Sequence, residues 1–137
     1  WWAGKSPNAA FTLAVAILLQ RSHDWSGAAL HIKTIVDSEL DRSDAASRLS
    51  GFCAEARVSA TAEVLVRGTA PVFDVIKHSS ASADLVFIGM RPPNADESSA
   101  DYSAYCEWLL RNIEVFPAAA LAMAGEKVDF HRIFEVQ

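Results

Sequence analysis

Short apolar segments rich in β-branched residues alternate along this chain with longer segments of helical periodicity, and this alternation constrains the fold most strongly. Strands that are joined by helices through right-handed crossovers form a parallel sheet with helices on both faces. The sequence therefore predicts an α/β fold with three layers, α/β/α. A length of 137 residues is sufficient for one core, so we expect residues 1–137 to form a single domain.

Four segments have the length and composition of strands. Residues 84–89 (DLVFIG) are apolar apart from the first, which is typical of a central parallel strand covered on both faces. The adjacent Trp1 and Trp2 leave room for one more strand that ends there, so we expect a mostly parallel five-stranded sheet. The other expected strands are residues 29–36, 60–66 and 118–124.

Four helices are expected from the spacing of apolar residues. They cover residues 8–20, with Asn8 as the cap; 41–57; a short segment capped by Thr69, with Pro71 in its first turn; and 99–114. Their expected apolar positions are Phe11, Val15, Leu18 and Leu19 in the first; Leu49, Phe52, Cys53 and Ala56 in the second; Val72, Phe73, Val75 and Ile76 in the third; and Tyr102, Tyr105, Cys106, Leu109, Leu110 and Ile113 in the fourth.

Charge and hydropathy argue against two classes of partner. The net charge is −5 and the basic residues are scattered, which disfavours nucleic-acid binding and a polybasic lipid-binding face. The longest apolar run, residues 9–19, has about 11 residues where a bilayer span needs about 20, so direct membrane insertion is not expected. The run also lacks the flanks of a signal peptide. Because the chain begins at Trp1 without a Met, we expect it to be part of a longer polypeptide.

No complete catalytic or metal-binding motif is present in the sequence. Cys53 and Cys106 lie among apolar residues and are interpreted as core residues in a reducing compartment. No two histidines have the spacing of a metal pair on one element, and no G-x-S-x-G motif makes a serine nucleophilic. We therefore predict no catalytic, cofactor-binding or metal-binding residue, and we expect neither a cofactor nor enzymatic activity. The residues considered are His23, His31, His78, His131, Ser79, Ser80 and Ser82.

Two segments resemble parts of phosphate sites. Gly4-Lys5-Ser6 is similar to the end of a P-loop, although the glycine that should precede it falls outside the sequence. Gly89 ends a buried strand, where open α/β sheets bind ligands, but Pro92 and Pro93 remove backbone donors nearby. Arg91 is a candidate anion-binding side chain there. An accidental match explains Gly4-Lys5-Ser6 better than phosphate binding does, and a lone Arg such as Arg91 is more often a solvated surface charge.

The tryptophans have both a packing and an interface interpretation. Trp1 and Trp2 should face opposite sides of a strand. Trp25 follows the first helix, and Trp108 falls at the margin of the apolar face of the fourth. Trp108 therefore fits core packing and an aromatic anchor at an interface equally well.

Several of these features resemble the cytosolic carboxy-terminal domain of prokaryotic cation-chloride cotransporters. The likeness lies in Trp1-Trp2 followed by a polar stretch and the Leu-rich residues 11–19, in Trp25 before residues 28–36, and in residues 84–89 followed by a helix, a proline, an apolar strand and Gly125-Glu126. It implies a fold like that of universal stress proteins. It also implies a non-catalytic role in assembly, trafficking or regulation of a membrane transporter.

The resemblance implies particular partners and a location. The partners would be the transmembrane domain of the same polypeptide and a second copy in a homodimer, on the cytoplasmic side of the cell membrane. Universal stress proteins that bind ATP carry a G-x-x-G motif after the fourth strand, where this chain has Gly89 and then Pro92. Two alternatives stay open: a nucleotide- or small-molecule-sensing domain of the universal stress type, and an enzyme fragment with a phosphate loop at Gly4-Lys5-Ser6.

Overall fold

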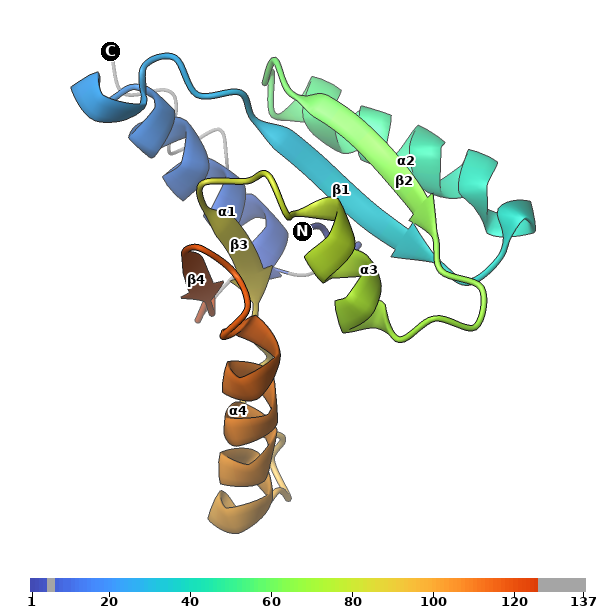
Figure 1. The fold of residues 1–137 in the computed structure, drawn as a ribbon, viewed down its shortest axis with the longest axis vertical. Helices are drawn as coiled ribbons and strands as arrows, with labels where there is room; N and C mark the ends of the chain where they lie inside the picture. Colours follow the sequence, from blue (N-terminus) through green and yellow to red (C-terminus); the bar gives the residue numbers. More distant parts are fainter. Residues whose placement is uncertain (5–6, 126–137) are drawn as a thin grey trace.

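The computed structural model describes residues 1–4 and 7–125, which form an α/β fold of helices and parallel strands (Figure 1). The α-helices are α1 (Pro7–Gln20), α2 (Arg42–Glu55), α3 (Val72–Ser79) and α4 (Ser99–Ile113). The strands are β1 (His31–Val36), β2 (Thr61–Val66), β3 (Val86–Gly89) and β4 (Ala119–Ala122), and two short 3₁₀ turns cover His23–Trp25 and Glu39–Asp41. The four predicted helices and the strands expected at residues 29–36, 60–66, 84–89 and 118–124 are therefore confirmed to within a few residues.

The strands pair two by two. β1 pairs in parallel with β2, with His31 opposite Thr61, and β3 pairs in parallel with β4, with Val86 opposite Ala119. The described residues thus form two two-stranded sheets, where the sequence predicts one sheet of five strands. Trp1 and Trp2 lie between the two pairs of strands, but two residues are too few to form the expected fifth strand (Figure 1).

One apolar cluster joins α1 and α2 to the first pair of strands. Leu49 of α2 is completely buried in it, and Leu13 and Ile17 of α1 pack there with Ile32 of β1. Trp2 also packs against this cluster, with its ring 5.8 Å from that of Phe52. The predicted apolar face of the second helix is confirmed at Leu49 and at its other members, Phe52, Cys53 and Ala56.

A second cluster joins α3 and α4 to β3. It contains Ile76 of α3, Val86 and Ile88 of β3, and Leu109 of α4, which is 2% exposed. Trp1 packs against this cluster. Trp1 and Trp2 therefore contact different clusters, as expected for neighbours with an extended backbone.

Three predicted helix faces are partly wrong. In α3, Val72 is 42% exposed, and Ile76 is the buried position. In α1, Leu18 is 58% exposed and Phe11 37% exposed, whereas the buried positions are Leu13, Ala14, Ala16 and Ile17. This helix is apolar nearly all round, so periodicity could not select the face. In α4, Leu110 is 50% exposed because it lies about 100° round the helix from Leu109.

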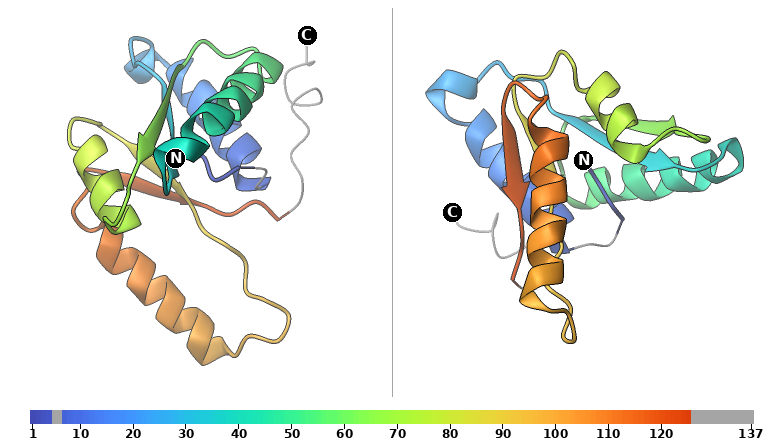
Figure 2. Two further views of the ribbon diagram at one scale, coloured as in Figure 1. Left: turned by 90° about the vertical axis from the view of Figure 1, so that its right-hand side faces the viewer. Right: turned by 60° about the horizontal axis from the view of Figure 1, so that its bottom comes forward.

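The predicted caps are wrong for α1 and α3. Helix α1 begins at Pro7, which places Asn8 inside the first turn, and α3 begins at Val72 after Pro71 rather than after Thr69. A true side-chain cap occurs at α4, where the Ser98 hydroxyl accepts a hydrogen bond from the Asp101 N–H at 3.1 Å. Helix α4 and the preceding loop, residues 90–98, project together from the rest of the molecule (Figures 1 and 2).

Candidate functional site

Asn8 fills the position at the carboxyl ends of β3 and β4 where an open α/β sheet could receive a ligand. Its side-chain nitrogen donates to the Met90 carbonyl at 2.8 Å, and its side-chain oxygen accepts from the Ala124 N–H at 2.7 Å. Gly89 lies directly against it: a Cβ at Gly89 would be 3.1 Å from the Asn8 side-chain nitrogen. The first turn of α1 is thereby tied to both strand ends, and its amide occupies this part of the rim.

Arg91, the candidate anion-binding residue at the same rim, is held by other residues. Its guanidinium makes two hydrogen bonds to the Glu97 carboxylate, at 2.7 and 2.5 Å, and lies 4.3 Å from the centre of the Tyr105 ring. The hydrogen bond from Arg91 lowers the pKa of the Glu97 carboxyl, so this partner stays ionised. Binding an anion at Arg91 would therefore require displacement of a bidentate ion pair.

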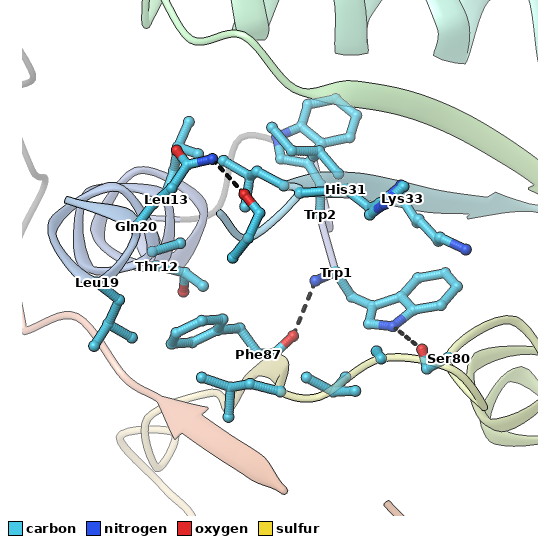
Figure 3. Close-up of a pocket in the computed structure, with 18 of the residues that line it drawn as sticks. Trp1, Trp2, Thr12, Leu13, Leu19, Gln20, His31, Lys33, Ser80 and Phe87 are labelled. Atoms are coloured by element: carbon cyan, nitrogen blue, oxygen red, sulfur yellow. Dashed lines mark hydrogen bonds between the residues drawn. The ribbon is translucent and has the colours of Figure 1, made fainter. Parts of the chain in front are cut away.

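A cavity of about 380 Å³ lies in the middle of the molecule between β1 and β3 (Figure 3). We call it the central groove. Its walls are the backbones and side chains of residues 30–33 on one side and 84–87 on the other, with α1 and residues 79–83 completing it. Sequence reasoning did not identify this groove, because it forms between segments that are about 50 residues apart in the chain.

Trp1 and Trp2 cross one end of the central groove. The α-amine of Trp1 donates to the Phe87 carbonyl at 2.9 Å (Figure 3). The backbone N–H of Trp2 donates to the Lys33 carbonyl at 2.8 Å. Burial lowers the pKa of the Trp1 amine from 8.0 to about 6, because the charged form loses water. The indole N–H of Trp2 is buried and has no acceptor among the described residues.

Polar side chains connect the groove to the end of α3. The indole N–H of Trp1 donates to the Ser80 hydroxyl at 3.1 Å. The Lys33 ammonium donates to the carbonyl and the hydroxyl of Ser79, at 2.8 and 2.7 Å, and pairs with Glu63 at 3.1 Å. Ser79 and Ser80 thus supply acceptors that hold Lys33 of β1 and Trp1 at the end of α3. Ser82 also lines the groove.

The remaining residues considered in the sequence do not come together as a site. In the described part of the chain, no three His, Cys, Asp or Glu side chains are close enough to hold a metal ion. His31 begins β1 and lines the groove, His23 lies in an exposed 3₁₀ turn, and His78 is exposed in α3. Lys5, Ser6 and His131 lie outside the described residues.

The two cysteines are separate and reduced. Cys53 and Cys106 are both half-buried and free, as expected for packing residues. Burial raises the pKa of the Cys53 thiol, which lowers the fraction of reactive thiolate at neutral pH.

An exposed aromatic surface lies where α3 meets α4. Trp108 is 48% exposed, and its ring packs edge-on against Phe73, with centroids 5.2 Å apart. Val72, next in the chain to Phe73, is 42% exposed. We call Val72, Phe73 and Trp108 the α3–α4 patch. Trp108 therefore packs against Phe73 and also against Tyr105, and the interface interpretation stays a prediction for its exposed part.

Among the described residues, no helix is both long enough and apolar enough to cross a membrane. Comparison with protein-family models, with curated proteins and with solved structures found no significant match to the chain.

Proposed function

We propose that this chain is a non-catalytic assembly and regulatory domain of a membrane transporter similar to the cation-chloride cotransporters. Ion transport would belong to the transmembrane domain of the same polypeptide, and this domain would lie on the cytoplasmic side of the membrane. The observation that carries the proposal is the occupied rim: Asn8 and the Arg91–Glu97 pair fill the positions where a catalytic or nucleotide-binding α/β domain needs open backbone donors.

The finer fold that we propose is a three-layer α/β/α domain of the universal stress protein type. Its support is the division of the core. One cluster lies under α1 and α2 and the other under α3 and α4, and Trp1 and Trp2 contribute to different clusters. A single mostly parallel sheet between two helical layers accounts for this division.

The α3–α4 patch is the surface that we propose for self-association into a homodimer. A half-exposed Trp beside a half-exposed Val is the kind of aromatic anchor found at the centre of interfaces. Trp108 belongs to α4, the helix that projects from the rest of the molecule (Figure 2).

Sedimentation equilibrium of the chain and of two variants tests this assignment. We expect a dimer, and we expect Trp108→Ser to weaken dimerisation by about 30-fold or more, the effect of losing an interface anchor worth about 2 kcal/mol. Leu110→Ser is the matched control. It lies on the same helix with nearly the same exposure, 50% against 48%, but about 200° round the axis.

Two results would contradict the proposal. A chain that stays monomeric at high concentration, or equal effects of both variants, would remove the assembly surface. Micromolar binding of ATP in calorimetry, lost on Arg91→Ala, would favour the nucleotide-sensing alternative. The gene offers a further test, because a series of apolar segments of about 20 residues upstream of Trp1 is expected for a transporter.

A further inference from the structure

We infer that the central groove between β1 and β3 is a docking slot for a parallel β-strand, and that its occupant is the segment of the polypeptide that directly precedes Trp1. The inference rests on the proposed function, since it requires this domain to be part of a longer chain. Its basis is the hydrogen-bonding geometry and the side-chain alternation of the strands on either side.

In β1, the backbone hydrogen-bonding groups of every second residue face the groove. Thr61 donates to the Leu30 carbonyl and Arg67 donates to the Val36 carbonyl, so the even-numbered residues of β1 bond to β2. In a parallel strand, the N–H and C=O groups of alternate residues point to opposite edges. The backbone N–H and C=O groups of the odd-numbered residues, His31, Lys33 and Ile35, therefore point into the groove.

Strand β3 shows the same arrangement from the other side. Val86 donates to the Ala118 carbonyl and Met90 donates to the Ala122 carbonyl, so its even-numbered residues bond to β4. The backbone N–H and C=O groups of Phe87 and Gly89 therefore point into the groove. The two pairs of strands thus face each other with complementary backbone edges, and a strand lying between them could bond to both.

Trp1 and Trp2 already occupy this position for two residues. Trp2 bonds to Lys33 of β1 and Trp1 bonds to Phe87 of β3, both from the backbone nitrogen. Consecutive residues that bond to opposite neighbours are the pattern of a central strand in a parallel sheet. The register continues upstream: the residue that directly precedes Trp1 would donate to the His31 carbonyl and accept from the Lys33 N–H.

The side chains on both sides of the groove are in phase with one continuous sheet. Ile32 of β1 and Trp2 belong to the cluster under α1 and α2, whereas Ile88 of β3 and Trp1 belong to the cluster under α3 and α4. The register pairs Trp2 with Thr34 and Trp1 with Ile88, so each Trp falls on the face that its neighbouring strand assigns to it. An inserted strand would therefore need apolar side chains on both faces, like β3.

The groove has other properties of an incomplete core. It runs beside residues 30–33, at the start of β1, and residues 84–87, at the start of β3, which is the length of about four strand residues. Three groups that prefer a partner or water lie there: the desolvated Trp1 amine, the Trp2 indole N–H and the inward-facing backbone (Figure 3). A peptide bond in place of the amine would remove a buried charge and keep the hydrogen bond to Phe87.

Chains with four extra residues before Trp1 provide the test. The probe is Ile-Val-Ile-Val, the flexible control is Gly-Ser-Gly-Ser, and the matched control is Ile-Val-Ile-Pro, in which proline removes the N–H that would donate to His31. The readout is hydrogen exchange at Lys33 and Phe87, whose N–H groups face the groove. Ile32 and Ile88, whose N–H groups bond to β2 and β4, are the internal references.

In the unextended chain, we expect Lys33 and Phe87 to exchange faster than Ile32 and Ile88. The apolar extension should slow exchange at Lys33 and Phe87 by about tenfold or more relative to these references, and the flexible extension should not. The proline variant loses only the hydrogen bond to the His31 carbonyl and keeps the carbonyl that accepts from Lys33, so its protection of Lys33 and Phe87 should lie between those of the apolar and the flexible chains. Equal exchange in the apolar and flexible chains would overturn the inference, as would protection that rises with protein concentration, because the occupant would then come from a second copy.

These outcomes are separate from those of the proposed function. Protection by the apolar extension in a chain that stays monomeric would support the docking slot and contradict the assembly role. Dimerisation without protection would support the assembly role and contradict the docking slot.

Discussion

In a polypeptide that begins at Trp1, the Trp1 amine should make the stability depend on pH in a defined window. In the folded state its pKa is about 6, against 8.0 for the unperturbed group, so the unfolded state binds more protons between these values. The free energy of unfolding should therefore rise with pH through this window. The cost of burying the charged amine is absent above about pH 8 and is fully present once the pH has fallen below about 6.

The lowering of this pKa from 8.0 to about 6 corresponds to about 3 kcal/mol between the charged and neutral forms. Between pH 8.5 and pH 5.5, most of that difference should be expressed, and we expect the free energy of unfolding to fall by about 2 kcal/mol. Urea unfolding at these two pH values, with the same buffer ions, measures it directly.

An N-acetylated chain is the control for this measurement. Acetylation removes the titrating amine but leaves an N–H that can donate to Phe87. The difference between the two chains also cancels the contributions of other titrating groups at the groove, including His31, Lys33 and Asp84. Parallel pH profiles for the acetylated and unmodified chains would refute the assignment of a desolvated amine.

Two further substitutions test the packing. Leu109→Ala should lower the free energy of unfolding by about 2–5 kcal/mol in urea, because it empties a position that is 2% exposed; an effect below about 0.5 kcal/mol would mean that α4 does not pack through this face. Gly89→Ala should cost about 1–3 kcal/mol, because its Cβ would lie 3.1 Å from the Asn8 side-chain nitrogen, and the cost should be smaller in an Asn8→Ala background; additive effects in the double-mutant cycle would show that the two residues do not meet.

The order and type of the elements could be predicted from the sequence because each has a strong local signal. Residues 84–89 are apolar and short, and residues 41–57 and 99–114 repeat apolar positions with helical period, so these elements needed no tertiary information. The stripe around Leu49 was predicted correctly because polar residues occupy the opposite face of α2. Helix α1 lacks such a polar face, and its buried side was predicted incorrectly.

The rim and the groove depend on contacts between distant segments and have no local signal. Asn8 bonds to the Met90 carbonyl 82 residues away, so its first-turn position was interpreted as a cap. The pairing of Arg91 with Glu97 crosses a loop whose shape is set by two prolines. The presence of Glu97 within the same loop was the one available indication that Arg91 has a partner, since opposite charges six residues apart can meet across a turn.

Helix α3 connects the central groove with the α3–α4 patch. Its last residue, Ser79, accepts two hydrogen bonds from Lys33, whose backbone faces the groove, and its second residue, Phe73, packs against Trp108. A helix of eight residues moves as a rigid unit over such a short length. A strand that bonds to Lys33 therefore acts on the same helix that shapes the aromatic surface. Coupling between them requires that the filled groove favour one position of α3 over another. Under the proposed function, this arrangement would place the connection to the membrane part and the surface for a second copy at the two ends of one helix.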